Sequence, residues 1–176
     1  PAALDDSVVD IRFADEMDRL PEPPLQFLYD FWQSKGGGRP GLSRREDFEM
    51  FALLPAVGNI MILDVERAGF DARYRLYGTK IALSAGKDWT GRAVSEMNES
   101  AKTNVALMYR AAYLAVFQTN HPLYTEHRSL PWMGAKAWRR VILPVTLEGT
   151  GCDQFVVGNV AVEARPQSTE QIETQR

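Results

Sequence analysis

The sequence has very few residues that form covalent cross-links or hold metal ions. It contains one cysteine, Cys152, and two histidines, His121 and His127. A single cysteine cannot close a disulfide bond within the chain, so a disulfide-stabilised fold is excluded, and the free thiol suits a reducing compartment. No cysteine or carboxylate accompanies the histidines in a pattern typical of a metal site. We therefore expect both histidines on the surface, and the sequence identifies no metal and no cofactor.

The sequence also lacks an excess of positive charge and a long apolar run. Lysine and arginine total 20 against 23 acidic residues, which gives a net charge of −3. A protein that binds nucleic acid by neutralising phosphates needs the opposite balance. No apolar segment approaches the roughly 20 residues that cross a bilayer. Residues 1–18 are acidic, unlike the basic start of a signal peptide. We expect a cytoplasmic protein that binds neither nucleic acid nor membrane.

Hydrophobic residues make up 45% of the chain, which is enough for one domain with its own core. We divide the chain into a flexible arm, residues 1–20, a domain, residues 21–163, and a polar tail, residues 164–176. The arm mixes acidic and small residues without a sustained period, and the tail has little to bury. No internal repeat and no linker divides the domain further.

A helix is predicted from Leu25 to Lys35, where apolar residues recur at helical spacing before three glycines. This helix carries more aromatic residues than one buried side needs. We therefore predict that it also contacts a second copy of the chain, and the alternative is that the arm folds back over it. The predicted dimer contact consists of Phe27, Tyr29, Phe31 and Trp32.

A basic cluster follows this helix and consists of Arg39, Arg44 and Arg45. Guanidinium groups suit a phosphate, but acidic residues directly after the cluster neutralise it, so we expect a structural role. Whether the cluster binds an anion stays open. Residues 43–46 also have the spacing of a helix capping box, which predicts a short helix over residues 47–51.

A β-hairpin is predicted from residues 59–66 and 72–77, two β-rich runs around a glycine-containing connection. In the second run Tyr74 and Leu76 alternate with arginines, so we expect both to point into the core.

The second half of the chain predicts one long helix and three strands. The helix covers residues 100–118, and the strands cover residues 123–130, 138–147 and 154–163. Pro144 interrupts the middle strand, and because proline removes a ladder donor we expect a bulge or an edge there. Strands that are segregated from helices favour an α+β fold with an antiparallel sheet.

The order of these elements resembles that of a PAS domain, in particular the PAS-type family common in alphaproteobacteria. The motifs that carry the resemblance are Leu54-Pro55, Leu63-Asp64-Val65, Tyr74 to Thr79, Gly86 to Arg92 and Leu143-Pro144. The resemblance covers Leu25 to Val162. It implies a five-stranded antiparallel sheet, inserted helices on one face, an N-terminal helix and a cavity between sheet and helices. It also implies a role in sensing, protein interaction or dimerisation, and it fixes no ligand.

Six residues are predicted to surround that cavity, because they fall on the inward side of a strand, on the apolar side of the long helix, or within an apolar run. They are Tyr74, Leu76, Met108, Val141, Leu143 and Asn159. Apolar periodicity reports burial, so it is compatible with a filled core as well as with a ligand pocket. Asn159 interrupts an apolar strand, and its amide needs a partner, for which we favour a backbone group over a ligand. Cys152 lacks the sequence context of the flavin-adduct PAS domains, so blue-light chemistry is not expected.

The leading functional hypothesis is a regulatory module that binds a small metabolite or a protein partner and signals through its N-terminal helix and dimer contact. One alternative is a small cone-fold enzyme of the isomerase or dehydratase type. The sequence argues against it, because Asp64 lies near a hairpin end and both histidines fall in one late segment, so no catalytic pair is apparent. A second alternative is a purely structural dimerisation domain.

Overall fold

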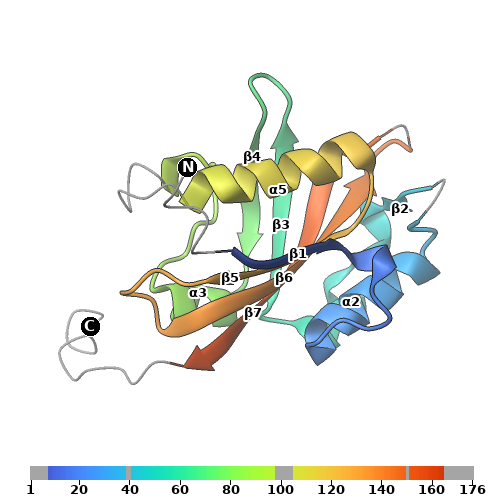
Figure 1. Ribbon diagram of the computed structural model, residues 1–176. Helices are drawn as coiled ribbons and strands as arrows, with labels where there is room; N and C mark the ends of the chain where they lie inside the picture. Colours follow the sequence, from blue (N-terminus) through green and yellow to red (C-terminus); the bar gives the residue numbers. More distant parts are fainter. Residues whose placement is uncertain (1–7, 39–40, 98–104, 150, 165–176) are drawn as a thin grey trace.

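The computed structural model describes residues 8–38, 41–97, 105–149 and 151–164, which form one sheet with helices on both faces (Figure 1). The strand order is β1-β5-β6-β7-β3-β4, and the short β2 pairs with β6. Only the β2–β6 pair is parallel among these strands. The strands are β1 (Val8–Phe13), β2 (Ser43–Arg44), β3 (Ile60–Glu66), β4 (Asp71–Tyr77), β5 (Leu123–Arg128), β6 (Ala135–Thr146) and β7 (Gln154–Ala164).

Helices cover the two faces of the sheet (Figure 1). The first face carries the N-terminal helix α2 together with short 3-10 helices, and the second face carries α3 and α5. We call them the α2 face and the α5 face. The helices are η1 (Ala14–Glu16), α2 (Pro23–Ser34), η2 (Arg45–Asp47), η3 (Met50–Ala56), α3 (Thr79–Ala85) and α5 (Val105–Thr119). The predicted α+β class, with inserted helices on one face and an N-terminal helix, is confirmed. The sheet has seven strands where the resemblance implies five, because β1 and β2 join it.

Each face has its own hydrophobic core. On the α2 face, Leu28 and Trp32 of α2 pack with Leu143 of β6. On the α5 face, Tyr113 and Val116 of α5 belong to a second cluster with the opposite sides of the same strands. The inner strands are therefore apolar on both sides, which removes the simple alternation that tells the inner face of a sheet from the outer one.

Two predicted helix boundaries need correction. The N-terminal helix starts at Pro23, before the predicted Leu25, because a proline in the first turn lacks only a donor that would have no helical partner. The short helix predicted over residues 47–51 is replaced by η2 and η3, and Ser43 does not cap a helix. Ser43 lies in β2, and its hydroxyl donates to the carbonyl oxygen of Trp32 at 2.6 Å. The predicted long helix is present as α5 where the structure describes it.

The predicted flexible arm, residues 1–20, also needs correction, because its described part contains strand β1. It pairs with β5 from Val8 opposite His127 to Phe13 opposite Leu123, and Phe13 packs against the core of the α5 face. The register shifts after Val8, so Val9 is an extra residue at a bulge. The pairing partner lies more than a hundred residues away, so no local pattern reveals this strand.

A bulge in β4 reverses the predicted direction of Leu76. Leu63 pairs with Tyr74 and Ile62 pairs with Leu76, which leaves Arg75 as an extra residue. One inserted residue turns the side chains that follow it to the other face. Tyr74 therefore lies in the α5-face core, whereas Leu76 packs against the α2-face core.

Pro144 lies at a local edge of β6, which is one of the two alternatives, a bulge or an edge, that the sequence predicts. It pairs with Phe155 of β7 without a register shift, so no bulge is present. On its other side, β5 pairs with β6 only as far as Ile142, and β2 begins at Val145. The carbonyl oxygen of Pro144 accepts a hydrogen bond from Nε1 of Trp32 at 2.8 Å in this gap.

In the part of the chain that the structure describes, none of the helices has the length and apolar composition needed to cross a lipid bilayer.

Candidate functional site

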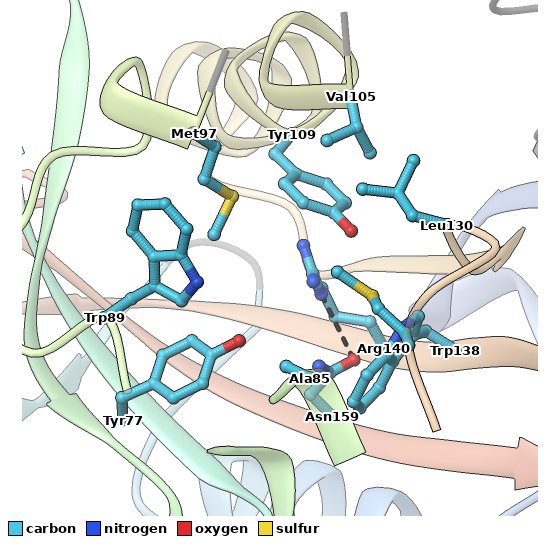
Figure 2. Close-up of a pocket in the computed structure, with 11 residues that line it drawn as sticks. Tyr77, Ala85, Trp89, Met97, Val105, Tyr109, Leu130, Trp138, Arg140 and Asn159 are labelled. Atoms are coloured by element: carbon cyan, nitrogen blue, oxygen red, sulfur yellow. Dashed lines mark hydrogen bonds between the residues drawn. The ribbon is translucent and has the colours of Figure 1, made fainter. Parts of the chain in front are cut away.

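A small cavity lies between the α5 face of the sheet and the helices α3 and α5 (Figure 2). Its volume is about 30 Å³, which is room for about two water molecules. Its walls are mainly aromatic and methionine side chains, and its polar groups come from an arginine, an asparagine and two tyrosines. The lining residues are Tyr77, Ala85, Trp89, Met97, Val105, Tyr109, Leu130, Met133, Trp138, Arg140 and Asn159.

Arg140 is the main polar group of the cavity. Side chains alternate along a strand, so Arg139 and Arg140 of β6 point to opposite faces. Arg140 points to the α5 face and is only 3% exposed. Its Nε donates to Oδ1 of Asn159 at 3.4 Å, on the neighbouring strand β7 (Figure 2). Its guanidinium carbon lies 4.2 Å from the ring centre of Tyr109 on α5. The cation is therefore enclosed between sheet and helix.

No carboxylate neutralises Arg140 within the described residues, because none of their ion pairs includes it. Arg139, its neighbour, pairs with Glu22 at 2.7 Å and with Glu126 at 3.0 Å on the α2 face. A buried cation without an anion costs several kcal/mol even after the protein relaxes around it. Arg140 is thus a buried cation beside a cavity, with no paired anion in the part of the chain that the structure describes.

Four tyrosines interact electrostatically with Arg140: Tyr74, Tyr77, Tyr109 and Tyr113. Burial raises the pKa of each hydroxyl above its ordinary value, and the charge of Arg140 offsets part of that rise. All four hydroxyls are therefore neutral at pH 7. The hydroxyl oxygens of Tyr74 and Tyr113 are buried without a hydrogen-bond partner in the described part of the chain. The core around Arg140 is thus polar but incompletely satisfied.

His127 extends this polar region, and its position corrects the prediction of a surface histidine. It is 1% exposed, and its Nε2 shares a hydrogen bond of 2.8 Å with the hydroxyl of Tyr109. Burial, together with the charge of Arg140, holds the pKa of His127 well below its ordinary value, so the imidazole is neutral at pH 7. Its Nδ1 has no hydrogen-bond partner among the described residues. His121, in contrast, is only partly buried and lies near Asp15.

The sequence model of one protein family, described as PAS domain, matches residues 20–149. The chain belongs to the PAS domain family. No curated protein and no solved structure matched the chain. The match contains every residue that lines the cavity of this PAS domain except Asn159. It confirms the predicted resemblance to a PAS domain, and it indicates a sensory or regulatory module.

The residues predicted to surround the cavity of the PAS domain divide between the two faces. Asn159 lines the cavity, and Tyr74 lies beside Arg140 in the same core. Met108 lies on α5 but lines a groove at the surface between α5 and β1. Three residues belong to the opposite, α2-face core, namely Leu76, Val141 and Leu143. The side chain of Asn159 contacts Arg140, where we favoured a backbone partner.

Sequence reasoning missed Arg140, Tyr109 and His127. One feature of the sequence could have identified Arg140, because two adjacent arginines in the middle of a strand must point to opposite faces of the sheet. Since the sheet is covered on both faces, either direction buries an arginine at least in part. The predicted long helix, residues 100–118, contains Tyr109, but helical periodicity does not show what its hydroxyl meets.

The predicted dimer contact of the PAS domain is also divided. Tyr29 and Trp32 are buried within the protomer, with Trp32 bonded to Pro144, so neither is open to a second copy. Phe27 and Phe31 are only partly buried, and their rings stack on each other with centres 6.0 Å apart.

The remaining candidates have local partners. Arg39 lies outside the described residues, Arg44 pairs with Glu46, and Arg45 donates to the carbonyl oxygen of Phe48. Burial raises the pKa of Cys152 to about 12, which makes its thiol unreactive at pH 7. The described residues contain no group of histidine, cysteine and acidic side chains that could hold a metal ion.

Proposed function

We propose that this PAS domain is a sensory module whose signal molecule binds in the cavity between the sheet and the helices α3 and α5. The observation that carries the proposal is Arg140, a cation buried in that cavity without an anionic partner among the described residues. In a purely structural core, apolar side chains of similar volume are often as stable as a buried charge or more so. A retained charge beside empty space favours recognition over a structural role.

The size of the cavity implies that binding moves side chains. A pocket for a drug-sized ligand measures roughly 300–1,000 Å³, and this cavity measures about 30 Å³. Met97 and Met133 line it, and methionine side chains adapt readily to a new neighbour. A ligand therefore stabilises a more open arrangement than the one observed, and this difference between two arrangements is what a sensor transmits.

Strand β6 offers a direct route from the cavity to the N-terminal helix. Arg140 faces the cavity, and the next residue toward the N-terminus, Arg139, donates to Glu22 at 2.7 Å. Glu22 is the N-cap residue of α2. A shift of β6 at Arg140 therefore acts on the start of α2 through one charged hydrogen bond.

The outer side of α2 and the neighbouring η3 form the surface where we place the dimer contact. Phe27 and Phe31 of α2 are partly exposed there, and η3 packs against α2. The segment formed by η3 and its C-cap residue exposes four large apolar side chains, which is typical of an interaction surface. They are Met50, Phe51, Leu54 and Val57.

The enzyme alternative finds less support. Asp64, the carboxylate considered for catalysis, pairs with Arg75 at 2.7 Å, and its Oδ1 also accepts from the side chain of Gln154. No carboxylate lines the cavity in the described part of the chain. The hydroxyl of Tyr109, which lines the cavity, is hydrogen-bonded to His127, and both partners are buried.

Native mass spectrometry of the protein purified without added ligand tests the ligand proposal. We expect a reproducible extra mass on the wild type that is absent from Ala85→Leu, because Ala85 lines the cavity and a leucine fills it. The matched control is Ala111→Leu on the exposed side of α5, which should retain the mass. A bare wild type whose thermal stability is also unaffected by extracts of small metabolites contradicts the proposal.

Sedimentation velocity tests the dimer contact. Phe51→Ser combined with Leu54→Ser should convert a dimer to a monomer, since both side chains are exposed in the protomer and contribute to no core. Leu83→Ser, an equally exposed change on α3, should leave the dimer intact. A monomeric wild type at micromolar concentration would show that this surface serves another purpose.

A further inference from the structure

We infer that the molecule recognised in the cavity is an organic carboxylate, with its carboxylate group on Arg140 and its apolar part among the aromatic and methionine side chains. This inference rests on the proposed ligand-binding function and names the chemical class of the ligand. It begins from the contacts of Arg140, which the described residues leave without an anion.

The groups that surround Arg140 within the described residues are all neutral. Its Nε reaches the amide oxygen of Asn159 at the long distance of 3.4 Å, and its charged plane lies over the ring of Tyr109. The neighbouring tyrosine hydroxyls are protonated at pH 7, and His127 is neutral. Such contacts compensate a buried cation only in part, because none of them carries a negative charge.

The environment is ready to accept an anion in other ways. The hydroxyls of Tyr74 and Tyr113 are buried without a hydrogen-bond partner in the described region, so the core beside Arg140 contains polar groups that are not satisfied. Arg140 itself is more than nine-tenths buried and lines the cavity, so a bound anion meets it away from competing water.

The charge and shape of the site favour a carboxylate over a phosphate. One guanidinium is the only cationic group that lines the cavity within the described residues. Its planar fork of donors matches the two oxygens of a carboxylate. A phosphate dianion carries more charge than a single arginine neutralises, and the lining residues that the structure describes include no lysine and no charged histidine to share it.

The other walls specify the rest of the molecule. Trp89 and Trp138 contribute aromatic surface, and Met97 and Met133 contribute adaptable apolar surface. A short aliphatic or aromatic body therefore fits better than a sugar or a polyol, whose hydroxyls would lack partners here.

Thermal unfolding with matched pairs of compounds tests the charge requirement. Benzoate is compared with benzamide, hexanoate with hexanamide, and inorganic phosphate serves as an anion without an apolar part. We expect the carboxylates to raise the melting temperature, and the amides and phosphate to leave it unchanged. Equal stabilisation by the amides overturns the inference but leaves the proposed ligand-binding function standing. No stabilisation by any compound, with no extra mass on the purified protein, overturns both.

Variants identify Arg140 as the binding group. Arg140→Gln should weaken carboxylate binding at least about 30-fold, as expected when one partner of a buried charge pair is truncated. Arg128→Gln, the same change at an exposed position of β5, should have no effect. Retained carboxylate binding by folded Arg140→Gln overturns the inference.

Asn159→Asp keeps the inference testable if Arg140→Gln does not fold. The new carboxylate stands where Oδ1 of Asn159 now accepts from Arg140, so it supplies the missing anion from within the chain. We expect a higher melting temperature and no further response to benzoate. An unchanged benzoate response contradicts the inference. A second result also contradicts the inference. In it, benzoate does not change the melting temperature of the wild type, and Glu99→Gln, at a position outside the described residues, loses as much stability as Arg140→Gln. The chain itself would then supply the anion.

Discussion

Two adjacent arginines of β6 show how differently the two faces of the sheet are built. Arg139 on the α2 face binds two carboxylates, Glu22 and Glu126. Arg140 on the α5 face is more deeply buried and has only neutral partners among the described residues. The same side chain is thus a structural clamp at one position and an unneutralised charge at the next. A face whose charges are paired holds the fold together, and a face with an unpaired charge remains open to a ligand.

The two faces also differ in how closely the helices pack on the sheet. On the α2 face, a Cβ atom at Gly158 would lie 2.7 Å from Cδ2 of Leu25 and 2.8 Å from Cδ1 of Leu28, so the helix rests directly on the backbone of β7. Trp32 uses its indole N–H on Pro144 in the same interface. The α5 face instead holds the cavity and two tyrosine hydroxyls that have no hydrogen-bond partner in the described part of the chain.

Breaking the close contact on the α2 face should have the largest effect. Gly158→Val places a branched side chain against α2 and should destabilise the fold by about 3 kcal/mol, the upper range for overpacking. Urea denaturation measures the change. Gly151→Ala is the control, because a Cβ atom there meets nothing within 4 Å. A loss below about 1 kcal/mol for Gly158→Val would mean that α2 moves away easily.

Removing the structural arginine should have the second largest effect. Arg139→Gln leaves Glu22 and Glu126 without their partner in a partly buried setting and should cost about 2 kcal/mol. Comparison with Glu22→Gln and with the double variant isolates the bond from β6 to the start of α2. Additive losses in this cycle would show that the two side chains are not coupled, and the proposed route from β6 to α2 would then lose its basis.

The buried histidine gives the α5 face a dependence on pH. The pKa of His127 lies well below its ordinary value of 6.5 in the folded protein, because burial and Arg140 disfavour the imidazolium. Below that ordinary value the unfolded chain binds a proton that the folded protein does not, so stability falls between 6.5 and the lower folded pKa.

A neutral substitution at this position isolates the effect. Between about pH 7.5 and pH 5.5, the wild type should lose about 1 kcal/mol more than His127→Gln. Denaturation at both pH values measures this difference. Parallel curves for the two proteins would mean that His127 takes up its proton in the folded state.

The smallest effect compares one tyrosine hydroxyl on each face. Tyr74→Phe removes a buried hydroxyl that has no partner in the described residues, and the change should be within about 0.5 kcal/mol of neutral. Tyr124→Phe removes a hydroxyl that donates to Oε2 of Glu126 at 3.1 Å on the other face, and it should cost about 1 kcal/mol. Equal losses would show that the hydroxyl of Tyr74 is hydrogen-bonded in solution, for example to a buried water molecule.

The sequence predicted the regular elements well because their patterns are local. The hairpin of β3 and β4, the long helix and the last three strands each contain enough apolar repetition to identify them. The prediction of a flexible N-terminal arm was wrong, because β1 forms a strand only through its pairing with the distant strand β5. The predicted direction of the Leu76 side chain was wrong, because the bulge at Arg75 depends on how β4 pairs with β3.

The site was harder to predict for a related reason. Val141 and Arg140 are neighbours on a strand that is buried on both sides, and hydrophobicity selects Val141 as the inward residue of a one-sided sheet. In the structure Arg140 lines the cavity, whereas Val141 lies in the core of the α2 face. Asn159 was found because an amide among valines is unusual, but its contact with Arg140 joins two strands and is invisible in either one alone.

Strand β1 also determines how the protein avoids unwanted association. Residues 92–94 cover the outer edge of β4 through hydrogen bonds to Ala72 and Tyr74, whereas β1 ends the sheet on the other side. Unpaired backbone groups on such an edge invite strands from other molecules. The bulge at Val9 and the charged pair of Asp10 and Arg12 disfavour that pairing. The edge thus carries its own protection against aggregation, and a neutral, regular β1 would turn the same sheet into a template for polymer growth.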